Sequence, residues 1–143
     1  MLTTGVDMGD AFEGTEKGDV FNAFDVVNPS TLTKLSTLNS FDTLDGKEGN
    51  DILNIQTGIA IPPATILNLT SIETVNVKSA VPLTLNGSNW EGTNTLNVTQ
   101  ATTSADLIAA ATTDVNVSGV TGTVDVDGGK NVNVTVAATG TAT

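Results

Sequence analysis

Repeats along the chain constrain its fold more than any other feature of the sequence. A nine-residue unit, Gly5-Val-Asp-Met-Gly-Asp-Ala-Phe-Glu13, is followed without a gap by Gly14-Thr-Glu-Lys-Gly-Asp-Val-Phe-Asn22. A further copy runs from Gly46 to Asn54, and a degenerate one before it keeps Asp42 and Leu44 in the same phase. Glycines permit a tight turn, the Asp carboxylate points into it, and the apolar residue two positions later faces inward. Each copy therefore predicts a turn followed by a short strand.

A second repeat, an apolar-Asn-apolar triplet, occupies most of the remaining chain. Alternation places Val75 and Val77 on one face of a strand and Asn76 on the other. Strand-like pieces such as Pro82–Asn86 lie between the triplets, so each coil offers two strands and two turns. The triplet asparagines are spaced 22, 21, 19 and 17 residues apart, and they are Asn54, Asn76, Asn97, Asn116 and Asn133.

These periods predict an all-β fold, a parallel β-solenoid of the β-roll or β-helix kind. We expect about five to seven short coils with two main sheets. Aromatic residues make up only 3% of the chain, which suits a narrow interior filled by Val, Leu, Ile and Ala. One unit spans 1–143, with nonapeptide coils over 1–55 and Thr/Asn/Val-rich coils over 56–143. Irregular loops are expected at 23–40, where one turn of helix is an alternative for Leu32 to Leu38, and at 58–70.

Charge and composition exclude several classes of function. The net charge is −11, and five lysines with no arginine give no basic patch for nucleic acid or an anionic membrane surface. No apolar run approaches the roughly 20 residues that span a bilayer, so membrane insertion is not expected. The absence of His and Cys removes thiol nucleophiles, His-dependent triads and Cys/His zinc sites, and we therefore expect no enzymatic activity.

The nonapeptides resemble the RTX, or hemolysin-type calcium-binding, repeat G-G-x-G-x-D-x-(apolar)-x over residues 5–22 and 42–54. The later coils look like the body of bacterial S-layer proteins and related type I-secreted surface proteins. The resemblance implies that the aspartate position of each copy coordinates calcium. Lys17 stands at a usual glycine position, and the copy before Gly46 lacks its glycines. The aspartates concerned are Asp10, Asp19, Asp42 and Asp51.

Calcium takes six to eight oxygen ligands, and one such turn supplies about half of them, so tandem turns are what the ion requires. Asp7, Glu16 and Asn50 lie in the same turns and are further candidate ligands. Aspartates that only cap turns through hydrogen bonds to the backbone are the structural alternative. Asp125 and Asp127 have the alternation of a solvated strand face, which is the interpretation we favour there.

The resemblance implies a secreted segment, extracellular or on the cell surface, whose folding and assembly depend on calcium. Nothing in 137–143 resembles a polar cap, so we expect a continuing chain or self-association into a lattice or filament, an S-layer being the most specific version. A cell-surface polysaccharide is a further candidate partner. Two alternatives stay open: an adhesin, ice- or glycan-binding module with a flat Thr/Asn face, and the RTX region of a secreted hydrolase whose catalytic domain lies elsewhere.

Overall fold

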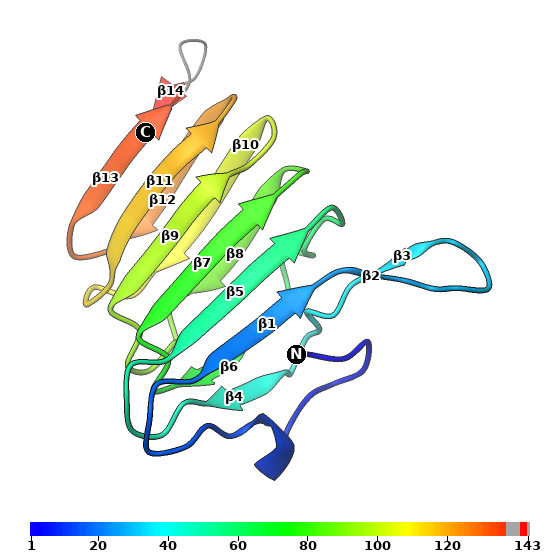
Figure 1. The fold of residues 1–143 in the computed structure, drawn as a ribbon. Coiled ribbons are helices and arrows are strands. Elements are labelled where there is room, and N and C mark those ends of the chain that lie inside the picture. Colours follow the sequence, from blue (N-terminus) through cyan, green and yellow to red (C-terminus); the bar gives the residue numbers. More distant parts are fainter. Residues whose placement is uncertain (137–140, 143) are drawn as a thin grey trace.

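The computed structural model describes residues 1–136, 141 and 142 of the chain, which forms a parallel β-solenoid (Figure 1). The coils stack along one axis, with β1 at one end of the larger sheet and β13 at the other. The larger sheet, called here the long sheet, consists of β1 (Val20–Phe24), β5 (Ile52–Thr57), β7 (Thr74–Ser79), β9 (Thr95–Gln100), β11 (Asp114–Val120) and β13 (Val132–Val136).

Two further parallel sheets lie on the opposite side of the solenoid (Figure 1). One contains β8 (Leu83–Gly87), β10 (Ser104–Ala109), β12 (Thr123–Gly128) and β14 (Thr141–Ala142). The other pairs β4 (Thr43–Asp45) with β6 (Asn68–Thr70). The prediction of a parallel β-solenoid with two main sheets is confirmed, and the chain makes about four turns where five to seven coils were expected.

Alternating side chains fill the interior between the sheets. The first inward column of the long sheet contains Leu53, Val75, Leu96 and Val115, none more than 1% exposed. Slim aliphatic side chains fill the interior, because the inward columns of the two sheets face each other. Leu107 of β10, on the opposite sheet, is fully buried in the same cluster. The inward placement predicted for Val75 and Val77 is therefore confirmed.

The two irregular regions leave the solenoid in different ways. In the first, β2 (Val26–Val27) and β3 (Lys34–Leu35) form an antiparallel hairpin that projects from the coil stack (Figure 1). The helical turn considered for this region does not form, because the two short strands pair across it instead. The second region returns to the stack through β6. A 3-10 turn, η1 (Asp10–Phe12), lies near the N-terminus.

One expectation from the sequence falls partly on residues that the structure does not describe. The missing polar cap was expected within 137–143, and residues 137–140 and 143 lie outside the part that the structure describes. No helix among the described residues is both long and apolar enough to cross a membrane.

The asparagines of the triplets form a continuous ladder along the long sheet. Each side-chain Nδ2 donates to Oδ1 of the asparagine in the preceding coil, over distances of 2.9 to 3.1 Å. The ladder begins at Asn22, the ninth residue of its nonapeptide, which pairs in register with Asn54. The ninth residue of the nonapeptide and the central asparagine of the triplet therefore occupy the same column of the long sheet.

Removing the amide of Asn76 is expected to destabilise the solenoid, since Asn76 both donates to Asn54 and accepts from Asn97. Two hydrogen bonds at about 1 kcal/mol each put the loss for Asn76→Ala at roughly 2 kcal/mol. The matched control is Asn133→Ala, because the exposed Asn133 makes one ladder bond. Urea unfolding followed by circular dichroism measures both, and equal losses would contradict a cooperative ladder.

Candidate metal site in the acidic turns

Two glycine-rich turns of neighbouring coils, residues 14–19 and 46–51, stack directly on each other. A Cβ added to Gly14 would lie 2.3 Å from the Gly46 carbonyl oxygen, and one added to Gly18 would lie 2.8 Å from that of Asn50. These distances are too short for any side chain, so the glycines allow backbone to pack on backbone. The two acidic turns are consequently held in contact.

Carboxylates from three successive coils form a column at the start of the long-sheet strands. The backbone N–H of Asp19 donates to Oδ1 of Asp51 at 2.6 Å, and that of Asp51 donates to Oε2 of Glu73 at 2.7 Å. The carboxylates of Asp51 and Glu73 therefore each accept from the turn of the preceding coil, which is the capping role that the structural alternative assigns to such acidic residues. The sequence reasoning missed Glu73, which has no glycine-rich repeat around it.

The second carboxylate oxygen of Asp51 has no hydrogen-bond partner among the described residues, although the residue is fully buried. The corresponding Asp19 has its Oδ2 satisfied by Thr15, whose N–H and Oγ1 lie at 2.7 and 2.9 Å. Lys47 replaces that threonine four residues before Asp51, and its N–H donates to Asp45 instead. Its ammonium pairs with Glu13 and Asp45, so nothing neutralises Asp51 Oδ2 from this side.

Asp7 and Asp42 form a second stacked pair. The Asp7 N–H donates to Asp42 Oδ1 at 2.9 Å, the Asn39 N–H donates to Asp42 Oδ2 at 2.7 Å, and both aspartates are buried. Burial raises the pKa of Asp42 above its ordinary value, although the two N–H donors oppose that shift. The nearby charge of Asp7 adds to the increase in pKa.

In the first nonapeptide, the residue that stacks on a later acidic turn is Asp7. Asp10 and Asp42 hold the same position of their repeats, but Asp7 lies beside Asp42, and Asp10 is exposed at the start of η1. The cause is the turn at Gly9, whose φ of 80° leads into a 3-10 hydrogen bond from the Phe12 N–H to the Gly9 carbonyl. Asp10 as a calcium ligand stays a prediction, without a carboxylate stacked on it.

A Thr-x-x-x-Asp spacing would have identified the correct register. Thr3 donates to Asp7 from its N–H at 2.7 Å, as Thr15 does to Asp19. The same spacing of four residues therefore marks both stacked turns at the N-terminal end of the chain.

Two further candidate ligands, Glu16 and Asn50, lie on the stacked turns. Glu16 and Asn50 are exposed, and within the described part of the chain neither side chain makes a hydrogen bond. The backbone carbonyl of Asn50 packs against Gly18. These two side chains are free to turn toward a cation.

The residues around Asp51 supply some of the oxygen ligands that a hard cation requires. A Cβ built on Gly46 would lie 1.9 Å from the Ser71 carbonyl oxygen and 2.5 Å from Asp51 Oδ2, so both oxygens converge on that glycine. A carboxylate and a backbone carbonyl are the ligand types that calcium prefers. No group of three or more acidic side chains in the described residues is arranged to hold a metal ion, so further carbonyls, Glu16 or water would complete the shell.

Comparison of the chain with protein-family models finds no match, and comparison with curated proteins finds no significant one. The RTX resemblance therefore depends on the residues of the repeats themselves.

Gly46→Ala is expected to unfold or displace the second acidic turn, because the new methyl group would collide with the Ser71 carbonyl and the Asp51 carboxylate. Overpacking of this kind costs about 1–3 kcal/mol. Gly5→Ala is the matched control, since its nearest neighbour would be Thr3 Oγ1 at 3.8 Å. Chemical denaturation compares the two variants, and a Gly46→Ala protein as stable as Gly5→Ala would contradict the stacked turns.

A carbon-detected NMR titration in chelator should separate Asp42 from Asp45. We expect Asp42 to titrate above 3.8, because burial raises its pKa, and Asp45 below 3.8, because hydrogen bonds from Lys47 lower its pKa. With the raised pKa, the stabilising contribution of Asp42 is complete below 3.8 and is lost as the pH rises through its folded-state pKa. The opposite order of the two titrations would refute the packing described around Asp42.

Proposed function

We propose that this chain is a non-enzymatic structural segment of a secreted surface protein, an S-layer or an extracellular filament, whose folding and assembly depend on calcium. The observation that carries the proposal is the buried, unpartnered Oδ2 of Asp51 in a turn stacked between two other acidic turns. An ionised carboxylate oxygen that is buried without a donor is costly, and a bound cation removes that cost.

Like charges in the carboxylate column strengthen the requirement for a cation. Asp19, Asp51 and Glu73 come from consecutive coils and are linked by hydrogen bonds of 2.6 and 2.7 Å between backbone and side chain. The chain as a whole carries a charge of −11, which raises the concentration of divalent cations around the molecule. The oxygen ligands favour a hard ion, and in the absence of His and Cys calcium is the best match.

Calcium binding and folding are then one linked equilibrium. Stacking of the turns brings the carboxylates together, so the ion binds the folded state in preference to the unfolded one. A chain of this kind stays loosely structured where calcium is scarce and becomes ordered outside the cell. This logic supports secretion, extracellular folding and a location at the cell surface.

Self-association is supported by the edges of the long sheet. β1 and β13 are its outermost strands in the described part of the chain, and edge strands offer backbone groups to another strand. The Leu2 N–H bonds to the Asn22 carbonyl and covers β1 at one point. A following coil or a second copy would extend the stack in the same direction, which is the geometry of filaments and lattices.

The alternative of a flat Thr/Asn binding face has weaker support. Each interior amide of the asparagine column donates one hydrogen bond and accepts one within the ladder, which fixes its orientation and leaves one donor and one acceptor position for a ligand. The alternative of an RTX region attached to a hydrolase concerns residues beyond this chain.

Calcium titration of metal-stripped protein tests the proposal. Saturation at one hundred times the Kd should stabilise the fold by about 2.7 kcal/mol, measured as a shift of the urea midpoint, and calorimetry should detect heat of binding. Electron microscopy of the same samples should show ordered assemblies with calcium and none with chelator. Absence of heat, stabilisation and assembly would refute the proposal.

Asp51→Asn should lose most of this calcium response while folding better than the native chain in chelator, since an amide removes the buried charge. Asp125→Asn is the matched control, because Asp125 is an exposed carboxylate on β12 outside the turns. It should respond to calcium as the native chain does. Equal responses of the two variants would exclude Asp51 as a ligand.

A further inference from the structure

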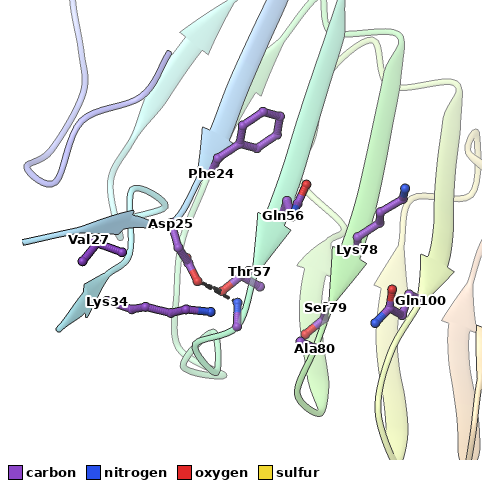
Figure 2. Close-up of a pocket in the computed structure, with 11 residues that line it drawn as sticks. Phe24, Asp25, Val27, Lys34, Gln56, Thr57, Lys78, Ser79, Ala80 and Gln100 are labelled. Carbon is purple, nitrogen blue, oxygen red and sulfur yellow. Dashed lines mark hydrogen bonds between the residues drawn. The ribbon is translucent and has the colours of Figure 1, made fainter. Parts of the chain in front are cut away.

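A groove lies at the carboxyl ends of the strands β1, β5, β7 and β9, away from the acidic turns (Figure 2). It is a hollow of about 250 Å³ bounded on one side by residues of the β2–β3 hairpin. A second hollow of about 330 Å³ shares Phe24, Gln56 and Lys78 with it and continues toward Asn54 and Asn76. Together they form an open trough across the long sheet.

The register of the long sheet aligns the side chains along this trough. Phe24 pairs with Gln56, Gln56 with Lys78, and Lys78 with Gln100. Adjacent strands lie about 4.8 Å apart, so the column presents one side chain at each such step along the solenoid axis. The regular spacing suits a linear polymer that lies along the stack.

The charge of the groove is opposite to that of the molecule. Two of the five lysines, Lys34 and Lys78, line it, and neither forms an ion pair within the described residues. The single carboxylate, Asp25, accepts from the Gly58 N–H at 2.6 Å and from Thr57 Oγ1 at 3.4 Å. The groove thus carries a net positive charge on a chain whose net charge is −11.

Lys34, one of these two lysines, belongs to the β2–β3 hairpin, which lies outside the coils. Lys34 extends toward Thr57 at the end of β5 (Figure 2). A Cβ added to the next residue, Gly58, would lie 2.9 Å from the Lys34 Nζ. The hairpin is inserted between β1 and β5, so the insertion places an ammonium group beside the column that the regular coils provide.

We propose that this groove binds a carboxylated oligosaccharide, independently of the calcium response. The Phe24 ring offers an apolar face for a sugar ring, and the amides of Gln56 and Gln100 can both donate to and accept from hydroxyl groups. Lys34 and Lys78 supply ammonium groups for the carboxylates. An acidic peptide fits less well, because the column of side chains crosses the strands, so a peptide lying along it would not run parallel to the edge strand β1 for backbone pairing.

The test uses the full chain at one fixed, saturating calcium concentration. Hyaluronan hexasaccharide is the anionic probe, the same hexasaccharide with reduced carboxyl groups is the neutral probe, and a hexaglutamate peptide is the peptide probe. Calorimetry should detect binding of the anionic saccharide, and NMR should show the largest shifts in the side-chain amides of Gln56 and Gln100. The two other probes should bind roughly tenfold more weakly.

The double variant Lys34→Gln/Lys78→Gln should weaken binding of hyaluronan hexasaccharide roughly tenfold. Lys130→Gln, an exposed lysine on the turn before β13, is the matched control and should bind as the native chain does. Because all three lysines are exposed, circular dichroism should be unchanged. The proposal would be overturned if the double variant and the control bound with equal affinity, or if the neutral hexasaccharide bound as well as the anionic one. Stronger binding of hexaglutamate, or no binding of the anionic probe, would also overturn it.

Discussion

In-register stacking of parallel coils is the constraint on which the rest of this structure depends. When each coil lies on the one before it without a shift, like residues meet like residues along the whole axis. Asparagines then form an amide ladder and aliphatic residues form continuous inward columns, both of which stabilise the stack. The same arrangement brings carboxylates of successive turns together, which destabilises it unless the charge is compensated.

The acidic turns show how that conflict is resolved locally. Asp19 has Thr15 as a donor to its outer oxygen, and Asp42 receives the backbone N–H groups of Asn39 and Asp7. Asp51 is left with one buried oxygen unpaired, since Lys47 interacts with Glu13 and Asp45 instead. A divalent ion at this point would complete the compensation, which is the basis of the proposed calcium response.

Stacking also explains how an acidic chain can hold a local cationic groove. Sheet register alone aligns Phe24, Gln56 and Lys78, whereas the charge of Lys34 arrives from an insertion that interrupts the repeat. The repeated coils place side chains at regular intervals, and the inserted hairpin adds a positive charge beside them. The acidic turns and the groove lie at opposite ends of the same strands, so the proposed cation and saccharide sites would not compete with each other.

Residue patterns alone determined the solenoid, its two sheets and its aliphatic interior, because alternation and a repeat near 20 residues have few other structural solutions. They also identified the turns that hold Asp19, Asp42 and Asp51. Tertiary structure decided that Asp7 lies beside Asp42, that Glu73 extends the carboxylate column, and that Lys34 and Lys78 line one groove. These contacts depend on which coils stack on each other on either side of an insertion. Sequence periodicity does not predict such contacts once an insertion has interrupted the repeat.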